Sequence, residues 1–540
     1  MERRFGSHVG YGLETQGEDS VVQIFTRQAE NYPERSAMFY FDTEWTWREY
    51  AHTVKVLANA FQNLGVQPGD RVIVMLQNMP ASSFVQLALW WLGAIIVPLN
   101  VMYRERELEY YVTDSGAVGA VVLNSVSARW LSLKDKLRFI VEVADDADCP
   151  GYRPELMPEQ TEWLPGAVHY HNLITSRSET PAHPVTTQPI AYLTYTSGTT
   201  GNPKGAINTH HNIISTAKVY VDLANLNSSD TIIAFAPLFH ITGSVAGLTA
   251  HIYTGAPLVL MYRYDAAEAL NAIERRKVTF TVGAITTYLA MMQREDLRDR
   301  DLSLFRKTYS GGAPVSPATV EQFEKITGCY IHNVYGLTES SNGMVMTPFG
   351  RRAPVDPDSG ALSIGKIGTG CEARIVDLTN PKIVLPPRMQ GELALRGDSI
   401  TSGYWNRPEA TSQSFVDGWF LTGDVATMDE DGWLYIVDRK KDLIITSGNK
   451  VWPREVEDAL YQHSAVREAA VVGEPDEYRG EMVTAYVALQ EGAVLSPEEL
   501  RGFVRSKLAA YKVPRKIEVV DEIPKTATGK FLRRALRRSR

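Results

Sequence analysis

The segment Tyr195-Thr-Ser-Gly-Thr-Thr-Gly-Asn-Pro-Lys-Gly205 carries more information about this protein than any other part of the chain, and it follows the apolar run Ala191-Tyr-Leu193. Glycines and small hydroxyl residues let backbone N–H groups and hydroxyls converge on phosphate oxygens, and Lys204 adds a positive charge. The Walker A pattern is absent, because Gly198 is not followed at the required spacing by Gly-Lys-Ser/Thr. The segment therefore predicts a phosphate-binding loop of another kind.

Around this loop, short β-branched runs such as Val118–Leu123, Thr231–Phe235 and Pro257–Met261 alternate with helical segments such as Ala266–Arg276. This alternation is typical of α/β layers with largely parallel sheets. From about Gly391 onward the strands become shorter and the turns tighter.

The charge run Asp438-Arg-Lys-Lys-Asp442 separates this part from a compact α+β unit formed by the last hundred residues. A short polar segment between two packed units is a place where a hinge can lie. We therefore expect one domain over residues 1–438 and a second over residues 439–540.

Composition excludes several classes of protein. The 540 residues are 44% hydrophobic and 22% charged, as in ordinary globular proteins, and 55 Lys and Arg stand against 63 Asp and Glu. A net charge of -8 argues against a general nucleic-acid binder. The three cysteines, Cys149, Cys329 and Cys371, form no Cys-x-x-Cys pair, which argues against a disulfide framework or a cysteine zinc site and favours a reducing compartment.

Membrane insertion is not expected. The N-terminal charges are followed by no apolar run, so no secretory signal is indicated. No charge occurs between Arg71 and Arg104, but Asn, Pro, Gln and Gly residues interrupt that stretch too often for a membrane span. We expect it to form a buried strand, helix and strand over Arg71–Leu76, about Ser82–Leu92 and Ala94–Pro98.

Six further motifs follow the loop in a fixed order. They are Pro237-Leu-Phe-His-Ile241, Ser310-Gly-Gly-Ala-Pro314, Asn333-Val-Tyr-Gly-Leu-Thr-Glu339, Trp419-Phe-Leu-Thr-Gly-Asp424, Gly432-Trp-Leu-Tyr-Ile-Val-Asp-Arg439 and Pro524-Lys-Thr-Ala-Thr-Gly-Lys530. Together with the loop they resemble the motifs of the adenylate-forming superfamily, which includes acyl-CoA synthetases, adenylation domains of peptide synthetases and firefly-type luciferases. The resemblance covers nearly the whole chain.

This resemblance implies a large N-terminal domain of stacked α/β sheets and a distorted β-barrel, and a small mobile α+β C-terminal domain. It also implies that the enzyme uses ATP, Mg²⁺ and CoA. A carboxylic acid would attack the α-phosphate of ATP to give acyl-AMP and pyrophosphate, and the acyl group would then pass to CoA with release of AMP. A cytoplasmic enzyme with small-molecule partners is expected, and a homodimer is left open.

The resemblance assigns the nucleotide site residue by residue. The matching positions are Thr196, Ser197, Gly198, Thr199, Thr200, Lys204, Gly312, Ala313, Pro314, Asn333, Val334, Tyr335, Gly336, Thr338, Asp424, Arg439 and Lys530. Catalytic roles fall to Lys530, Thr338 and Lys204, and Glu339 would bind Mg²⁺. Asp424, assisted by Arg439, would accept hydrogen bonds from the ribose hydroxyls, while Tyr335 would stack on adenine and Asn333 would bind its edge.

The remaining assignments concern the acid, CoA and the hinge. The acyl pocket would be formed by His240, Thr242, Gly243, Ala246, Gly312, Ala313, Val334 and Gly336. Arg263 and Gly448 would contact CoA, and Lys441 falls at the hinge position. Ile445 and Ser447 replace lysines of the plant hydroxycinnamate ligases. The C-terminal arginines, Arg533 among them, are expected to form a solvated cationic end.

Substrate class is the least determined property. The segment Phe235–His240 contains no aspartate that could pair with an amino group, and the chain ends ten residues after Lys530, so a free acid and CoA are expected. Val334 stands where aryl-acid ligases have glycine, which favours an aliphatic acid of short, medium or long chain. The alternatives are an aryl or alicyclic acid, a carrier protein as acceptor, a luciferase-type oxygenase and a catalytically dead binding module.

Overall fold

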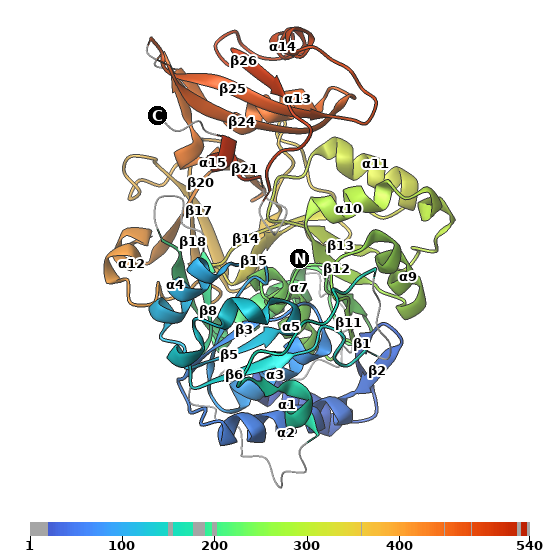
Figure 1. Ribbon diagram of the computed structural model, residues 1–540. Coiled ribbons are helices and arrows are strands. Elements are labelled where there is room, and N and C mark those ends of the chain that lie inside the picture. The colour runs from blue at the N-terminus through green and yellow to red at the C-terminus, as the bar shows by residue number, and fades with distance from the viewer. Residues whose placement is uncertain are drawn as a thin grey trace, which may run out of the picture.

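The computed structural model describes residues 20–149, 155–175, 189–196, 202–357, 359–447, 449–476, 478–525 and 531–536. Two large sheets share one hydrophobic core, and two five-stranded sheets follow them in the chain. Figure 1 shows the last sheet at the end of the molecule opposite helices α1 (Val21–Asn31) and α2 (Trp47–Asn63). This mixed α/β architecture confirms the fold class predicted from the alternating segments.

The first large sheet has seven strands in the order β7-β6-β5-β3-β4-β8-β9, and only the β8–β9 pair is antiparallel. Its strands are β7 (Val168–His169), β6 (Phe139–Val143), β5 (Gly119–Leu123), β3 (Arg71–Met75), β4 (Ile95–Pro98), β8 (Ile190–Thr196) and β9 (Lys204–Thr209). The helices between them are α3 (Pro80–Trp91), α4 (Glu105–Ser115), α5 (Asn124–Ser127) and α6 (Tyr170–Ile174), with short 3₁₀ turns η1 (Ala128–Trp130) and η2 (Lys134–Lys136).

The predicted strand, helix and strand of the charge-free stretch are confirmed as β3, α3 and β4. All twelve residues of α3 are buried, and proline at its first position leaves no orphan N–H there. A helix that is apolar on every side must be covered on every side, which explains why hydropathy alone made this stretch resemble a membrane span. In the described part of the chain no helix is long and apolar enough to cross a membrane.

The second large sheet has nine strands in the order β16-β15-β14-β13-β12-β10-β11-β1-β2. They are β16 (Lys366–Ile367), β15 (Asn342–Met346), β14 (Ile331–Leu337), β13 (Lys307–Ser310), β12 (Phe280–Gly283), β10 (Ile232–Ile233), β11 (Leu258–Leu260), β1 (Ser36–Tyr40) and β2 (Thr43–Thr46). The associated helices are α7 (His210–Leu223), the π-helical turn η3 (Gly243–Thr249), α8 (Ala250–Thr254), α9 (Ala266–Arg276), α10 (Ile285–Met292), η4 (Glu295–Asp299) and α11 (Pro317–Thr327).

The third sheet is antiparallel. It contains β17 (Cys371–Val376), β18 (Gly391–Gly397), β20 (Trp419–Met428), β19 (Phe415–Val416) and β21 (Leu434–Arg439), with α12 (Pro408–Ser414) beside it. In Figure 1 this sheet and α12 lie on the opposite side of the molecule from α9, α10 and α11.

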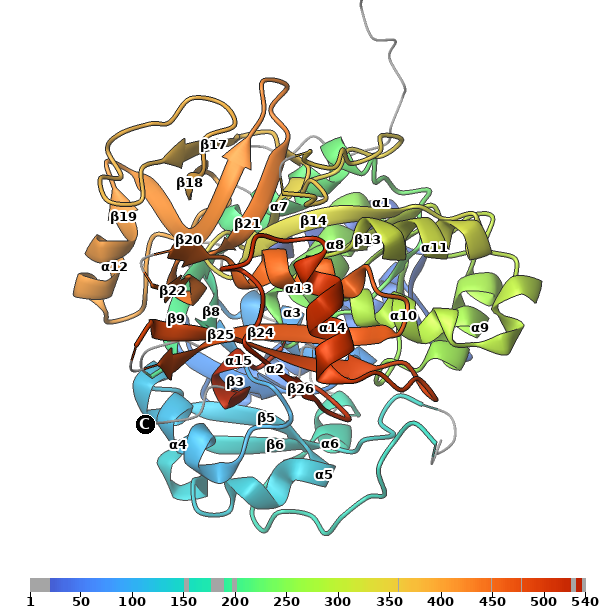
Figure 2. The ribbon, with the colours of Figure 1, turned by 90° about the horizontal axis from the view of Figure 1, so that it is seen from above.

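The fourth sheet is formed entirely by residues after the charge run. It contains β23 (Asn449–Val451), β22 (Ile444–Thr446), β25 (Gly480–Leu489), β24 (Val466–Asp476) and β26 (Lys516–Val519), and its helices are η5 (Lys440–Asp442), α13 (Pro453–Tyr461), α14 (Pro497–Arg505) and α15 (Arg533–Leu536). Figure 2 shows β24, β25 and α14 lying across this end of the molecule. The unit has its own apolar core, formed by Ile444, Val456, Leu460, Val471, Val487 and their neighbours.

We expect the buried side chain of His251 to make the free energy of unfolding depend on pH. Its buried ring stacks on Trp47 with 4.8 Å between ring centres, and Nδ1 lies 2.6 Å from the carbonyl oxygen of Ala256. Burial lowers the pKa of His251 from 6.5 to about 4. Between pH 6.5 and about pH 4, His251 is therefore protonated in the unfolded chain but neutral in the folded chain. The free energy of unfolding should fall by up to about 3 kcal/mol as the pH falls through this range.

Urea unfolding between pH 7 and pH 4.5 measures this effect. The variant His251→Asn should lose part of the acid sensitivity, whereas His52→Asn, which changes an exposed histidine on α2, should keep it. The interpretation is wrong if His251→Asn and the unchanged protein lose stability with acid to the same extent.

Candidate active site

The base of the predicted phosphate loop is the β8–β9 hairpin, in which Thr196 pairs with Lys204 and Tyr195 pairs with Gly205. The Tyr110 hydroxyl donates to the carbonyl oxygen of Pro203 at 2.6 Å, which ties the loop's second arm to α4. A side chain at Gly205 would place its Cβ 3.3 Å from the Tyr195 ring, so glycine allows this close packing. The predicted residues Ser197, Gly198, Thr199 and Thr200 lie outside the described residues.

Asp114 on α4 holds the first arm of the hairpin. Its Oδ2 accepts a hydrogen bond of 2.7 Å from the Tyr195 hydroxyl, and its Oδ1 forms an ion pair with Arg407. Only 9% of the Asp114 side chain is exposed, so this pair is better shielded from solvent than a surface ion pair. The first arm of the loop is therefore anchored by Asp114 and Arg407, neither of which belongs to a recognised motif.

Thr338 and Glu339 lie in the turn of the β14–β15 hairpin. The turn closes with Ser341 at φ 52° and Asn342 at φ 94°, both in the left-handed region that side chains seldom adopt. Strained backbone of this kind occurs at functional sites. Gly336 is required by the hairpin itself, because a Cβ there would stand 1.7 Å from the carbonyl oxygen of Asn342.

Asn208 connects this turn to the strand that follows the phosphate loop. Its side-chain amide donates to the carbonyl oxygen of Thr338 at 2.9 Å and to the hydroxyl of Ser341 at 3.0 Å. Asn208 is on β9 and fully buried. The contact thus places the Thr338–Glu339 turn of one large sheet against β9 of the other.

Tyr404 is a residue of this site that the sequence motifs did not indicate. Its hydroxyl donates to Oε1 of Glu339 at 2.7 Å, and the Lys204 ammonium lies over its ring, 5.3 Å from the ring centre. The structure thereby brings the predicted metal ligand and the predicted phosphate-binding lysine to the same side chain. The only signal in the sequence was a pair of aromatic residues, Tyr404-Trp405, after a glycine.

Asp424, Arg439 and Tyr335 form a second group. Asp424 and Arg439 are paired neighbours on β20 and β21, and Arg439 Nε lies 3.4 Å from Asp424 Oδ1. The Tyr335 hydroxyl donates to Asp424 Oδ2 at 2.6 Å. Burial and the Asp424 carboxylate raise the pKa of Tyr335 well above its usual value, so the hydroxyl remains a donor. The predicted adenine-stacking residue is therefore linked directly to the predicted ribose-binding residue.

The predicted adenine-lining segment follows β13. Ser310 pairs with Asn333 of β14, and Gly312 has φ +78°, so the chain bends at Gly312 and Ala313 directly beside β14; Pro314 follows this bend. The Asn333 amide donates to the carbonyl oxygen of Ser363 at 3.1 Å. This hydrogen bond uses one N–H of Asn333, and the role of Asn333 at adenine stays a prediction.

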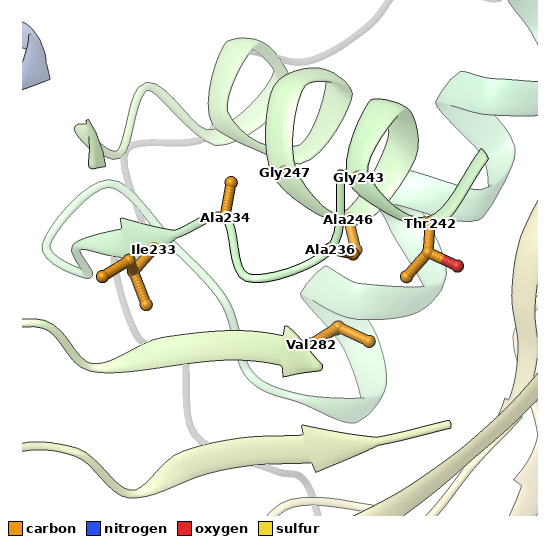
Figure 3. A pocket seen from close by; sticks show the side chains of 8 residues that line it. All are labelled: Ile233, Ala234, Ala236, Thr242, Gly243, Ala246, Gly247 and Val282. Atoms are coloured by element: carbon orange, nitrogen blue, oxygen red, sulfur yellow. The ribbon is translucent and has the colours of Figure 1, made fainter. Parts of the chain in front are cut away.

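A narrow pocket lies beside η3, and its empty volume of about 160 Å³ includes space that is open to solvent. Figure 3 shows the lining residues Ile233, Ala234, Ala236, Thr242, Gly243, Ala246, Gly247 and Val282. Thr242, Gly243 and Ala246 are among the residues predicted for the acyl pocket, whereas His240, Gly312, Ala313, Val334 and Gly336 do not belong to this lining. The Thr242 hydroxyl donates to Asn342 Oδ1 at 3.2 Å, which joins the pocket wall to the Thr338–Glu339 hairpin.

Local geometry explains the glycine at this wall. A Cβ on Gly243 would stand 2.1 Å from the carbonyl oxygen of Pro237, so only glycine fits there. His240 lies just before the turn, and its Nδ1 accepts a hydrogen bond of 3.2 Å from the N–H of Thr242. π-helical turns inside helices are frequent at functional sites.

The other predicted positions are distributed along the chain. Arg263 follows β11 and donates to the carbonyl oxygen of Glu155 at 2.9 Å. Lys441 lies within η5, directly after β21. Gly448 and Lys530 lie outside the described residues, so their predicted contacts with CoA and the acid stay predictions.

The expectation of a solvated C-terminal arginine is wrong for Arg533. Its Nη2 lies 2.7 Å from Glu457 Oε2 on α13, and its Nη1 lies 3.8 Å from Asp442 Oδ2 in η5. The Glu457 carboxylate raises the pKa of Arg533. A charge run in sequence resembles a solvated tail, but here the fold brings acidic partners from two distant segments to one arginine.

Comparison with known proteins agrees with this geometry. The model of the AMP-binding enzyme family matches residues 25–405, and that of the AMP-binding enzyme C-terminal domain matches residues 455–530. The chain is 34% identical over 535 residues to a long-chain-fatty-acid–CoA ligase of Bacillus subtilis (strain 168), covering 96% of this chain and 94% of the relative. It is 33% identical over 513 residues to a feruloyl-CoA synthase of Amycolatopsis sp, covering 95% and 97%. The crystal structure of an anthranilate CoA ligase in complex with anthranoyl-AMP is similar with a TM-score of 0.85 and 29% identity, covering 97% of both chains.

The fold and these matches define an AMP-binding enzyme. The chain belongs to the AMP-binding enzyme family of the adenylate-forming superfamily, which confirms the resemblance seen in the motifs. The predicted enzyme class, an ATP-dependent acid–thiol ligase, is confirmed as well, and at this level the activity is that of an acyl- or aryl-CoA ligase.

Proposed function

We propose that this enzyme joins an aliphatic carboxylic acid to CoA in two steps. In the first step a carboxylate oxygen attacks the α-phosphorus of ATP, a new P–O bond forms, and the bond to the pyrophosphate leaving group breaks. In the second step the CoA thiol attacks the acyl carbon and AMP leaves. Catalysis of the first step consists mainly of positioning and fixed positive charge, because negative charge accumulates on the phosphate oxygens.

One observation supports this proposal most directly: the side chain of Tyr404 contacts both Lys204 and Glu339. Lys204 would bind the β- and γ-phosphates together with the loop residues 196–200, and the Thr338 hydroxyl would bind the α-phosphate. Asp424 with Arg439 would hold the ribose. Lys530 would supply a positive charge at the reacting oxygens.

A magnesium ion fits this site chemically. Mg²⁺ is usually held by one or two carboxylates together with substrate phosphates, and Glu339 supplies one carboxylate beside the predicted phosphate site. Within the described residues no group of three or more His, Cys, Asp and Glu side chains could hold a metal without the nucleotide. When bound, the ion would neutralise charge on the transferring phosphates, and Glu339 would hold it there.

The narrow pocket beside η3 supports an aliphatic acid. Its lining combines small and aliphatic side chains with one threonine. Val334 does not line this pocket, and its place in the acyl pocket is a prediction from the motif resemblance. Its Cγ1 and Cγ2 lie 2.9 Å and 2.6 Å from where Cβ atoms on Gly311 and Gly343 would stand. An aryl acid is the second candidate, favoured by the similarity to a feruloyl-CoA synthase.

A panel of acids tests the proposal. Saturated straight-chain acids of increasing length, aryl acids and alicyclic acids are each incubated with ATP, and AMP and pyrophosphate are measured with and without CoA. We expect straight-chain acids to give the highest kcat/KM and CoA thioesters to form. Failure of every acid to yield AMP would contradict the proposal, and adenylate formation without any CoA thioester would favour a carrier-protein acceptor.

Val334→Ala provides the matched test of the acid preference. Removing its two methyl groups should raise the ratio of kcat/KM for aryl over straight-chain acids about tenfold or more, since differences of one methylene in a pocket change rates by roughly 10–200-fold. Val471→Ala, which shortens a buried valine on β24 in the C-terminal sheet, should leave the ratio unchanged. An unchanged ratio in Val334→Ala would show that this side chain does not limit the pocket.

A further inference from the structure

Tyr404 lies between two site residues that come from different sheets. Glu339 is in the turn of β14–β15 in the nine-stranded sheet, and Lys204 begins β9 of the seven-stranded sheet. The hydroxyl of Tyr404 donates to one of them and its ring faces the ammonium of the other. A single side chain therefore contacts the carboxylate assigned to the metal and the cation assigned to the phosphates.

The backbone around Tyr404 is fixed by contacts of its own. The Thr401 N–H donates to the carbonyl oxygen of Glu339 at 2.7 Å, and the Trp405 N–H donates to the carbonyl oxygen of Gly205 at 2.8 Å. Gly403 has φ +139°, and a Cβ there would stand 2.4 Å from Thr411, so the approach requires glycine. These contacts hold the segment without the Tyr404 hydroxyl, so its loss should leave the fold intact.

We infer that Tyr404 is a positioning residue of the adenylation step, which orients the Glu339 carboxylate toward Mg²⁺ and the Lys204 ammonium toward the phosphates of ATP. This inference rests on the proposed function. The Tyr404 hydrogen bond uses Oε1 of Glu339, which assigns Oε2 to the metal. The ring holds the lysine by a cation–π contact, which leaves the three N–H groups of the ammonium for phosphate oxygens.

The chemistry of Tyr404 suits this task. A phenol hydroxyl carries its proton at neutral pH, so Tyr404 can donate to the Glu339 carboxylate. A group that hydrogen-bonds to a metal-binding side chain fixes the orientation of that side chain. Removal of such a group costs about 10–100-fold in metal affinity or activity. A phenylalanine ring in place of Tyr404 would retain the cation–π contact with Lys204 but would lose the hydrogen bond to Glu339.

The test is the equilibrium binding of ATP by calorimetry with and without Mg²⁺, in the absence of any acid so that no turnover occurs. In Tyr404→Phe we expect ATP affinity without Mg²⁺ to match the unchanged enzyme, and the gain in affinity on adding Mg²⁺ to fall about tenfold. In Tyr404→Leu, which also removes the ring under Lys204, affinity should fall without Mg²⁺ as well. A gain from Mg²⁺ in Tyr404→Phe equal to that of the unchanged enzyme would overturn the inference.

Two controls separate positioning from general damage. Tyr435→Phe removes a similar hydrogen bond, from a buried tyrosine to Asp429 at 2.9 Å, and should leave both ATP affinities unchanged. In a Glu339→Gln background, Tyr404→Phe should add no further loss, because both changes act on one interaction. Equal losses in Tyr435→Phe, or full additivity with Glu339→Gln, would overturn the inference. The proposed function would be contradicted by a different result, namely that the unchanged enzyme produces no AMP with any of the acids tested.

Discussion

Lys530→Ala should lower the rate of acyl-adenylate formation about 10²–10³-fold while leaving thioester formation from supplied acyl adenylate much less affected. The reason is that negative charge develops on the phosphate oxygens only in the first step, and losing one preorganised donor there typically costs about 3–4 kcal/mol. In the second step a thiol must reach the acyl carbon, and the superfamily resemblance assigns Lys530 no contact in that step.

Pyrophosphate exchange measures the first half-reaction, and the transfer of acyl groups from synthetic acyl adenylate to CoA measures the second. The control is Lys525→Ala, which removes a lysine of the same motif whose Nζ lies 2.6 Å from Glu468 on β24. It should affect both half-reactions weakly. If Lys530→Ala reduced both half-reactions equally, the two-conformation interpretation would be wrong.

Lys441→Pro should have the opposite effect, with adenylate formation largely kept and thioester formation reduced on the order of 10²-fold, as is seen when reacting groups are misplaced by about 1 Å. Lys441 lies in η5, where the chain passes from β21 to the C-terminal sheet. Proline fixes φ near −65°, and a hinge residue must change its backbone angles when one domain turns against the other. This prediction depends on the proposed division into domains 1–438 and 439–540.

Two contacts close to Lys441 would have to persist or break if the C-terminal domain rotated. Lys440 Nζ lies 2.8 Å from Glu392 on β18, and Asp438 Oδ2 accepts a hydrogen bond of 2.8 Å from the N–H of Arg454 at the start of α13. The control Lys441→Ala removes only the side chain and should retain both half-reactions. The hinge assignment would be refuted by Lys441→Pro behaving alike in the two half-reactions.

Several features could be predicted from sequence because neighbouring residues determine them. The buried β3–α3–β4 unit follows from an uninterrupted apolar pattern with proline at the helix start. The residues after the charge run form the α+β unit that the sequence predicted, with α14 over Pro497–Arg505 and β25 over Gly480–Leu489. The family itself was visible in ordered motifs, because nucleotide binding requires particular residue types at short spacing.

Contacts between distant parts of the chain could not be predicted in this way. The hydrogen bond from Tyr404 to Glu339 joins residues 65 positions apart, and that from Tyr335 to Asp424 joins residues 89 apart. Arg533 was expected to be solvated because its neighbours in sequence are cationic, yet its partner Glu457 is 76 positions away. Such partners depend on how sheets and hairpins pack, which local composition does not encode.

The sequence by itself therefore determined the enzyme family, the alternation of elements and the residue types available for phosphate, metal and ribose. Tertiary structure alone decided which side chains hold those residues in place. Short-range order follows from the chain's own periodicity and turn chemistry, whereas orientation at the site follows from packing β9, the β14–β15 hairpin and the segment around Tyr404 against one another.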